Sequence, residues 1–426
     1  MIMRNLILFF LLFFLFSCKK KDNSLPSIEV YQPAKNATIN AGETITIKGK
    51  ATDNIKIEHI QIWLKDESGK IVGNSKTLYA DKNEFEFQTG FEVSSLTPSG
   101  KYYFQIKAND GTNDKSEFVH VYINEVPLTA EHIWLASNTG NQSNLYDFTT
   151  GSPVYKTSFA GDFIGSAFFS SNKVYVNCGK HYGNLTGFNT KTNSNDWEVP
   201  CIQNPTFPYF TSISKSIEGK ILVSYYNEQI NVYDAQGTLQ RTIQNTPGYY
   251  SEIAFLDEEN NVLICLEKPK STGNNLLSVY YYSSGAIANQ MTVNADVKGF
   301  AKNSSKIFAF GNENNSIKKY AYQFNNKQIQ LEQTINSDSL FFSFNKVNEA
   351  TYFAQKNGLY TFINSTDTKS FISNKTYSYF TLDEVNDVIY GIRNDSIFSF
   401  NLSTKVESFA YFNGNTWKSI EVEYNK

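Results

Sequence analysis

A pattern of four short apolar runs joined by tight polar turns recurs along most of this chain, and it limits the folds that the chain can adopt. Residues 378–412 show the pattern clearly, because polar turns rich in Asp, Asn, Ser and Thr separate their apolar runs. Apolar and polar residues alternate with a period close to two, which is typical of β-strands and not of helices. Each copy therefore predicts one antiparallel sheet of four strands.

Six complete copies align on the second apolar run, at residues 163–199, 208–243, 249–293, 297–335, 340–374 and 378–412. Their period of roughly 35–45 residues is typical of β-propeller blades. A seventh copy is split, because residues 133–159 match only the last three strands and residues 417–424 match the missing first strand. Joining the two ends buries edges that an open array would expose. We therefore expect an all-β protein whose residues 130–426 form a seven-bladed β-propeller closed by the C-terminal strand.

The chain begins with the pattern of a secretory signal. Arg4 precedes a run of Leu, Phe and Ile that ends at Ser17-Cys18, and this run is shorter than the roughly 20 apolar residues of a membrane-spanning helix. The ending Leu-x-Ser-Cys resembles the bacterial lipobox. The resemblance implies that residues 1–17 are a lipoprotein signal peptide, that Cys18 is lipidated and that residues 18–25 are a tether. An ordinary signal peptide with an incidental cysteine is the alternative.

The composition is rich in Asn, Lys, Tyr and Phe and poor in Pro and Met, and in this it resembles proteins of Bacteroidetes. The Lys-Lys-Lys-Asp segment after Cys18 loosely resembles the export tags of surface lipoproteins in that phylum, although those tags favour acidic residues. We expect a lipid anchor in the outer membrane, and the periplasmic and cell-surface leaflets both stay open. The net charge of −3 argues against a nucleic-acid partner.

Residues 26–126 are strand-like but do not follow the repeat. They resemble bacterial immunoglobulin-like domains in an opening strand that ends in Gln32-Pro33, in an Ala-Gly-Glu turn before Thr44, and in Ala51-Thr52-Asp53-Asn54 before an apolar strand. The resemblance implies a β-sandwich of roughly seven strands in two sheets. For function it implies a spacer or docking module.

Asp and Asn clusters in this domain have two interpretations. Cadherin-type relatives bind calcium through such clusters, and calcium takes six to eight oxygen ligands. The same residues are the commonest turn formers, because their side chains bond to their own backbone. We favour turns and predict no metal site. The residues concerned are Asp53, Asn54, Asp110, Asn113 and Asp114.

Patterns that signal catalysis are few. The four histidines are His59, His120, His132 and His181, and no two have metal-ligand spacing. Nucleophile-elbow, Walker and dinucleotide-binding motifs are missing from the sequence. The acidic pairs at 257–259 and 383–384 recur at the same turn of their blades, which indicates turn formers. Carboxylates of glycosidases come from distant positions, so their spacing does not exclude a glycan-active enzyme.

Three cysteines follow Cys18, so at least one of them is unpaired. Cys178 and Cys265 occupy matching places at the ends of second strands, which is typical of small buried side chains. Cys201 lies in a link between two blades. A Cys178–Cys201 disulfide is the open alternative.

The best candidate for a binding surface is one face of the ring. Propellers meet ligands on the face built by the links between blades and by the turns between second and third strands, which here brings together segments 179–182, 205–209 and 247–250. Exposed aromatic rings there would stack on a sugar or pack against a protein. Alternatively, Tyr209 and Tyr249 begin inner strands and belong to the core. The candidate binding residues are His181, Tyr182, Phe207, Tyr209, Tyr249 and Tyr250.

The blades resemble the YVTN and quinoprotein-like propellers, as in residues 173–177 before residues 184–192. The tryptophan-docking signature of true quinoproteins is missing, so the resemblance implies no quinone, and we predict no cofactor. We expect a binding or scaffold protein rather than an enzyme. Its partner would be an outer-membrane barrel or transporter in an envelope or nutrient-uptake complex. The alternative is a glycan-active hydrolase or lyase with its site on the propeller face.

Overall fold

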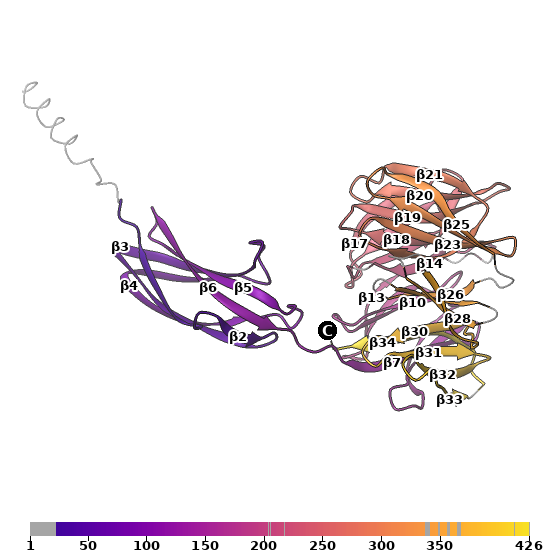
Figure 1. Ribbon diagram of the computed structural model, residues 1–426, viewed down its shortest axis with the longest axis horizontal. Coiled ribbons are helices and arrows are strands. Elements are labelled where there is room, and N and C mark those ends of the chain that lie inside the picture. Colours follow the sequence, from indigo (N-terminus) through magenta and orange to yellow (C-terminus); the bar gives the residue numbers. More distant parts are fainter. Residues whose placement is uncertain are drawn as a thin grey trace, which may run out of the picture. The chain divides into compact units, whose positions relative to one another are not determined.

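The computed structural model of the protein describes residues 23–425, except 203, 205, 217, 337–340, 348–349, 356–357, 364–367 and 413. In this part of the chain every helix or strand is a β-strand, and the strands form two compact units that meet between Pro127 and Leu128 (Figure 1). Over the same residues no helix is long and apolar enough to cross a membrane. The predicted signal peptide and Cys18 lie outside the described residues.

The N-terminal unit contains six strands, labelled in Figure 1 where there is room. They are β1 (Ser27–Gln32), β2 (Ala37–Asn40), β3 (Thr44–Asp66), β4 (Lys76–Glu92), β5 (Gly100–Asn109) and β6 (Asp114–Asn124). The register of the β3–β4 pair shifts between Thr52 and Ile57. Before the shift β3 pairs with β1, and after it β3 pairs with β5. We expected roughly seven separate strands, and the number is smaller because β3 and β4 run on through the bend.

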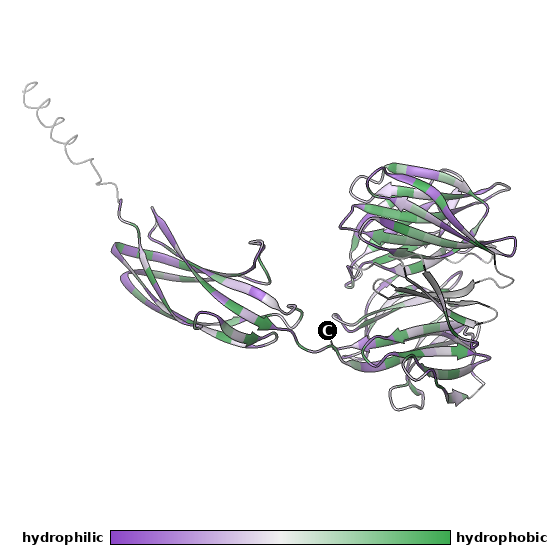
Figure 2. Ribbon diagram, in the orientation of Figure 1, coloured by the Kyte–Doolittle hydropathy of each residue, from purple (hydrophilic) through white to green (hydrophobic). Residues whose placement is uncertain are grey.

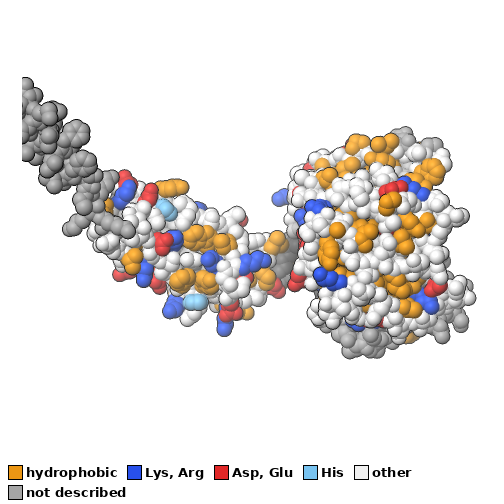
Figure 3. Space-filling view, turned by 90° about the horizontal axis from the view of Figure 1, so that it is seen from above, with side chains coloured by type: hydrophobic (Ala, Val, Ile, Leu, Met, Phe, Trp, Pro, Cys, Tyr) orange, Lys and Arg blue, Asp and Glu red, His pale blue; other side chains and the backbone are white. Residues whose placement is uncertain are grey.

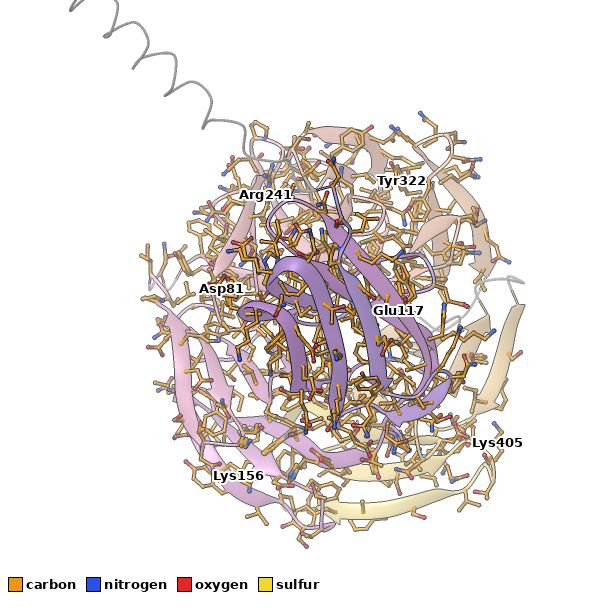
Figure 4. The ribbon with its side chains drawn as sticks, turned by 90° about the vertical axis from the view of Figure 1, so that its left-hand side faces the viewer. Asp81, Glu117, Lys156, Arg241, Tyr322 and Lys405 are labelled. Atoms are coloured by element: carbon orange, nitrogen blue, oxygen red, sulfur yellow. The ribbon has the colours of Figure 1, made fainter. Side chains whose placement is uncertain are left out.

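Alternation along these strands builds the core of the N-terminal unit. On β3, Ile60, Ile62 and Leu64 are buried, and they pack in one cluster with Phe104 and Ile106 of β5. Figure 4 shows the neighbouring strands of this unit with their side chains, including Asp81 of β4 and Glu117 of β6. One face of each strand is apolar and the other is polar, as a two-layered sandwich requires.

The Asp and Asn clusters of this unit bond to their own turns. Asp53 Oδ1 accepts hydrogen bonds from the backbone nitrogens of Ile55 (2.8 Å) and Lys56 (3.1 Å). Asp110 Oδ1 accepts from the backbone nitrogens of Thr112 and Asn113 at 2.6 and 2.5 Å. The carboxylates at 53 and 110 are therefore turn formers. Among the described residues, no group of three or more His, Cys, Asp or Glu side chains is placed to hold a metal ion.

The C-terminal unit is built from seven antiparallel sheets of four strands each. Blade one is β34 (Trp417–Tyr424), β7 (Ala130–Asn138), β8 (Gln142–Asp147) and β9 (Val154–Ala160). Blades two to four are β10–β13 (Gly165–Phe169, Val174–Cys178, Leu185–Asn189, Ser194–Val199), β14–β17 (Phe210–Lys215, Ile221–Tyr225, Gln229–Tyr233, Leu239–Gln244) and β18–β21 (Tyr249–Asp257, Val262–Pro269, Asn275–Tyr281, Ile287–Val293). Blades five to seven are β22–β25 (Asp296–Lys302, Lys306–Glu313, Ser316–Gln323, Gln328–Asn336), β26–β29 (Phe341–Val347, Ala350–Gln355, Gly358–Ile363, Thr368–Ser373) and β30–β33 (Tyr379–Asp383, Val388–Arg393, Ser396–Asn401, Glu407–Phe412).

The sheets close into a ring. The first strand of each blade contacts the first strand of the next, and the cycle runs through β34, β10, β14, β18, β22, β26, β30 and back to β34. We call these the inner strands. Strand β34 pairs with β7, which places Ile420 opposite Leu135 and Val422 opposite Ile133. The predicted seven-bladed propeller, closed by the C-terminal strand, is confirmed.

The strands of a blade differ in how deeply their residues are buried. The second strands β11 and β15 are buried at every residue, whereas the fourth strands β13 and β17 are mostly exposed. Lys156 of β9 and Lys405, in the turn after β32, lie at the rim of the ring in Figure 4. Hydrophobic residues accordingly follow the strands in Figure 2. The core between neighbouring blades is therefore built from the first three strands of each blade, and the fourth strand contributes least.

Two details of this unit differ from expectation. Strand β7 begins at Ala130, so His132 lies inside the strand and not before it, with Nδ1 3.0 Å from Asp147 Oδ2. Cys178 ends β11 as expected, but Cys265 lies in the middle of β19, since that strand runs on to Pro269. Both thiols are fully buried, as predicted.

Candidate binding surface and central cavity

The links and turns that we expected to converge are joined by backbone hydrogen bonds. The nitrogen of Tyr209, in the link before β14, donates to the oxygen of Lys180 in the turn after β11 (2.8 Å). The nitrogen of Lys270, in the turn after β19, donates to the oxygen of Gly248 in the link before β18 (2.9 Å). These bonds hold the loops of blades two to four together at the end of the ring where the inner strands begin. We call this end the strand-start face.

A group of stacked rings lies on this face. The rings of Phe207 and Tyr226 are stacked at 5.1 Å between centroids, and the ring of Tyr250 lies 5.0 Å from that of Tyr226. Lys270 Nζ lies 5.0 Å from the centre of the Tyr226 ring and 2.9 Å from Glu228 Oε1. We call Phe207, Tyr226, Tyr250 and Lys270 the aromatic cluster. Phe207 is 47% exposed, so the cluster offers an apolar surface to solvent.

Two members of the cluster were missed by the sequence analysis. Tyr226 directly follows β15 and Lys270 directly follows β19, so both occupy the turn between second and third strands. His181 and Tyr182, which the sequence analysis predicted, occupy the same position in blade two. Applying the rule to every blade would have found Tyr226 and Lys270 as well.

The other predicted residues lie apart from the aromatic cluster or partly in the core. Tyr209 is half-buried and meets the rings of Phe210 and Tyr225 edge-on at 4.8 and 5.4 Å. Tyr249 is half-buried at the start of β18. Tyr182 is 44% exposed and its ring lies 6.0 Å from that of His181. Residue 205 of the predicted 205–209 segment lies outside the described residues.

His181 is held by a carboxylate. Its Nδ1 lies 2.9 Å from Asp162 Oδ2, and Asp162 Oδ1 also accepts the backbone N–H groups of Lys180 (2.8 Å) and Tyr182 (3.0 Å). Burial alone would raise the pKa of Asp162, but the hydrogen bonds from the 180–182 backbone and from His181 outweigh it and lower that pKa to about 2. Asp162 therefore stays ionised and fixes the loop that carries His181.

Cys201 lies next to this loop but is not an activated nucleophile. Its Sγ donates a hydrogen bond to the main-chain oxygen of His181 (3.3 Å), and burial together with the charge of Asp162 raises its pKa to about 11. A thiol with this pKa stays protonated at neutral pH. Cys178 and Cys201 are both free thiols in the structure and pack in one hydrophobic cluster.

A second candidate site lies along the axis of the ring. Residues of β10, β14, β18, β22, β30 and β34 line a cavity of about 480 Å³. Four charged side chains face it, namely Lys215, Lys298, Glu384 and Glu421. Lys215 ends β14 and Glu384 lies in the turn after β30, whereas Lys298 and Glu421 lie within β22 and β34. We call this the central cavity.

Burial dominates the electrostatics of the central cavity. Lys215 Nζ donates to the main-chain oxygen of Phe168 (2.7 Å) and lies 4.9 Å from the centre of the Phe169 ring. Burial lowers the pKa of Lys215, against the attraction of Glu421. Burial likewise raises the pKa of Glu421 to about 7, against the attraction of Lys215. Lys215 is nevertheless exposed and Glu421 is only partly buried, so the cavity is open to solvent.

The recurring acidic turns divide into two roles. Asp257 and Asp383 accept hydrogen bonds from the side-chain nitrogens of Asn260 (2.9 Å) and Asn386 (2.6 Å), so the prediction that they form turns is confirmed. The adjacent Glu384 also lies in the turn, as predicted, and is in addition one of the residues that line the central cavity. Burial and the neighbouring charge of Asp383 raise its pKa.

Comparison with known proteins characterises one unit of the chain. Residues 26–116 match the family described as bacterial Ig domain. The N-terminal unit is a bacterial Ig domain. This match covers less than half of the chain. No curated protein matches the sequence.

Two solved structures resemble the fold of the chain. One is dihydro-heme d1 dehydrogenase NirN in complex with DHE, with a TM-score of 0.45, 11% identity, and coverage of 69% of this chain and 76% of that one. The other is Kuenenia stuttgartiensis hydrazine synthase, with a TM-score of 0.44, 9% identity, and coverage of 64% of this chain and 90% of that one. Likenesses this distant say nothing about activity, cofactor or partner.

Proposed function

We propose that this protein is a lipid-anchored binding or scaffold protein of the outer membrane whose propeller recognises a partner protein through the aromatic cluster. The observation that carries this proposal is the cluster itself. Phe207, Tyr226 and Tyr250 form a continuous series of ring contacts, and Lys270 lies beside it with its charge balanced by Glu228. Aromatic and cationic side chains with this arrangement dominate the binding energy of protein interfaces.

Hydrogen bonds among the described residues join the segments around the cluster, which suits recognition. Backbone hydrogen bonds join Lys270 to Gly248 and Asn245 to Glu228, which ties the links between blades to the turns beside them. The rings are further restrained by contact with one another. A preorganised surface loses little conformational entropy when a partner binds, so more of the contact energy appears as affinity.

The rest of the chain serves the same role in this proposal. Lipidation of Cys18 would hold the protein at the outer membrane of a Bacteroidetes-type envelope, in a leaflet that we leave open, and the Ig domain would act as a spacer. The partner we favour is an outer-membrane barrel or transporter, which would make the protein an accessory subunit of an envelope or nutrient-uptake complex. Figure 3 shows hydrophobic side chains in small groups among polar ones on the visible face of the propeller.

A glycan-active hydrolase or lyase with its site on the propeller face is the second candidate. The observation in its favour is that two carboxyl groups, Glu384 and Glu421, line one cavity. The pKa values of both are raised, and a carboxyl with a raised pKa is suited to act as a general acid. Turnover of a glycan by the wild type, lost in Glu421→Gln, would favour this function over the first.

Affinity purification tests the binding proposal. The full-length protein with a C-terminal tag would be recovered from native membranes in mild detergent, and co-purifying proteins would be quantified by mass spectrometry. We expect one outer-membrane protein in stoichiometric amount with the wild type and a loss of at least tenfold with Tyr226→Ala. Tyr155→Ala is the matched control, because Tyr155 is also an exposed aromatic residue (55%) but lies on β9, the outer strand of blade one.

Either of two results would overturn the binding proposal: recovery of the tagged protein alone, or equal recovery of the partner with Tyr226→Ala and the wild type. The anchor has a separate test. Cys18→Ser is expected to move the protein from the membrane fraction to the soluble fraction and to abolish incorporation of a labelled fatty acid. Retention in the membrane with no label incorporated by the wild type would refute lipidation.

A further inference from the structure

Of the four charged groups of the central cavity, Lys298 forms an ion pair with Asp296, whereas Lys215, Glu384 and Glu421 form no ion pair with the described residues. Most of the hydroxyl groups around it are already bonded. Ser166 Oγ donates to Ser419 Oγ at 2.9 Å, Ser214 Oγ donates to the oxygen of Ala254 at 2.7 Å, and Ser170 Oγ accepts from the nitrogen of Tyr424 at 3.0 Å. These hydroxyl groups are therefore used in hydrogen bonds within the propeller. The groups that can still bind a ligand are the charged side chains.

Glu421 is the clearest of these. It lies on the closing strand β34, facing the axis of the ring. Within the described part of the chain its carboxylate has no hydrogen bond and no ion pair, and its one strong electrostatic partner is Lys215. Glu421 is partly buried, and a partly buried carboxylate without a hydrogen-bond donor is costly, because water solvates it less than in the unfolded chain. A protein that keeps such a group commonly uses it to hold a ligand.

Lys215 and Glu384 also retain free capacity. Lys215 donates one of its three hydrogens to Phe168, which leaves two directed elsewhere in the cavity. Glu384 is anchored through its backbone nitrogen, which donates to Tyr424 Oη at 3.0 Å, while its carboxylate has no ion pair among the residues described. The cavity therefore presents both unused acceptors and unused donors.

This mixture of charges selects one class of ligand. Lys215 disfavours a metal cation beside Glu421, and the two carboxylates disfavour a simple anion, whereas the charge of Lys298 is balanced by Asp296. A neutral sugar would offer Glu421 only hydroxyl donors, whereas an ammonium group also balances its charge. Hydrogen bonds between charged partners are roughly twice as strong as those between neutral ones. A molecule that carries an ammonium group and a carboxylate satisfies both sets of protein groups.

We propose that the central cavity binds a small zwitterion, an amino acid or a short peptide, with its ammonium group at Glu421 and Glu384 and its carboxylate at Lys215. The cavity volume of about 480 Å³ lies within the range of small-molecule sites. Phe168, Phe255 and Phe300 are also among the residues that line it.

The cavity and the aromatic cluster can be tested separately, because they lie toward opposite ends of the inner strands. Tyr250 lies at the start of β18, whereas the cavity is lined by Ile253, Ala254 and Phe255 further along the same strand. Variants of one site leave the residues of the other in place. Failure of the zwitterion proposal therefore does not decide the binding proposal, and the reverse also holds.

Thermal unfolding of the full-length protein in mild detergent tests the zwitterion proposal. The probes are a mixture of the twenty amino acids, a mixture of neutral monosaccharides, and calcium chloride, each added separately. We expect the amino-acid mixture alone to raise the unfolding midpoint, by a few degrees, because a ligand that binds only the native state stabilises it. The responsible amino acid would then be titrated by calorimetry.

Chemical variants of the ligand make the test independent of mutation. The N-acetyl derivative of the active amino acid lacks the ammonium group and is expected to bind at least tenfold more weakly, as is the derivative whose carboxylate is converted to an amide. On the protein side, Glu421→Gln keeps the shape of the side chain and should also weaken binding at least tenfold. Glu218→Gln is the control, since Glu218 is an exposed carboxylate in the turn after β14.

The zwitterion proposal is overturned if no amino acid raises the midpoint, or if sugars or calcium do so in place of amino acids. It is equally overturned if the N-acetyl derivative binds as tightly as the parent, or if folded Glu421→Gln keeps wild-type affinity. Retention of affinity by Glu218→Gln together with its loss in Glu421→Gln is the result we expect.

Discussion

The two ends of the inner strands differ in the exposure of their aromatic rings and in the pairing of their charged side chains. At the strand-start face the rings are partly exposed and the charges are satisfied, since Lys270 pairs with Glu228 and Asp162 accepts several backbone N–H groups. In the central cavity Glu421 forms no hydrogen bond with the described residues, and its electrostatic partner is Lys215. The first environment suits recognition by shape and desolvation, and the second suits recognition by charge.

The largest effect on stability is expected from a change that weakens the whole propeller, and with it both the strand-start face and the central cavity. Trp134 is 2% exposed, and its Nε1 donates to Glu423 on the closing strand at 2.7 Å. Trp134→Ala would leave a large cavity and weaken the junction of β34 with β7, which costs about 3–5 kcal/mol of unfolding free energy. Urea unfolding of the variant and the wild type measures this loss. A loss below about 1 kcal/mol would mean that the ring does not depend on this closure.

Asp162 should make the strand-start face sensitive to acid. Its folded-state pKa is lowered from 3.8 to about 2, so the ionised form stabilises the protein above pH 4, and this contribution is lost as the pH falls through 4 toward 2. The lost stability amounts to about 2 kcal/mol. The difference in unfolding free energy between the wild type and Asp162→Asn should therefore shrink over this pH range. An unchanged difference from pH 6 to pH 2 would contradict this assignment.

Glu421 should show the opposite pH dependence. Burial raises its pKa from 4.5 to about 7, so its ionised form destabilises the native state above pH 7, and the penalty disappears as the pH falls through 7 toward 4.5. Glu421→Gln is expected to be more stable than the wild type at pH 8, by about 1–3 kcal/mol, because the raised pKa already includes the attraction of Lys215. The two proteins should be equally stable at pH 4. Greater stability of the wild type at pH 8 would show that Glu421 has a structural partner.

The smallest effect on stability is expected at the aromatic cluster. Phe207 is 47% exposed, so Phe207→Ala removes little buried surface and should change the unfolding free energy by less than about 1 kcal/mol. The same variant should weaken partner recovery in the affinity purification, because the Tyr226 ring loses its stacked neighbour. Strong destabilisation would instead assign Phe207 to the core. A matched loss of stability and binding would remove the contrast between the two ends.

Much of the propeller could be predicted because its signal is local and repeated. Alternation within each copy identified the four strands. The first strand is missing before residue 133, which required residues 417–424 to supply it, and β34 does so by pairing with β7. The Ig domain was less predictable in detail. Strands β3 and β4 continue through a bend where local turn signals such as Asp53 indicated a break. Pairing with strands distant in sequence decided that the backbone stays extended there.

The candidate sites were predictable only where they depend on loops. The position of a turn within a repeat is a sequence property, so His181, Phe207 and Tyr250 could be named in advance, and Tyr226 and Lys270 were within reach of the same rule. The central cavity was not. Lys215 lies in blade three and Glu421 in the closing strand of blade one, far apart in the sequence, and nothing in either neighbourhood signals the other.

The sequence by itself therefore determined the repeat, the strand order and the closure of the ring, because these follow from periodicity and from the need to bury strand edges. Tertiary structure alone decided which side chains share an environment. Ring closure brings β34 beside β10, so that Ser419 bonds to Ser166, and it places Glu421 in the same cavity as Lys215. The pKa values of these groups depend on that enclosure, and burial is a property of the assembled fold rather than of any segment.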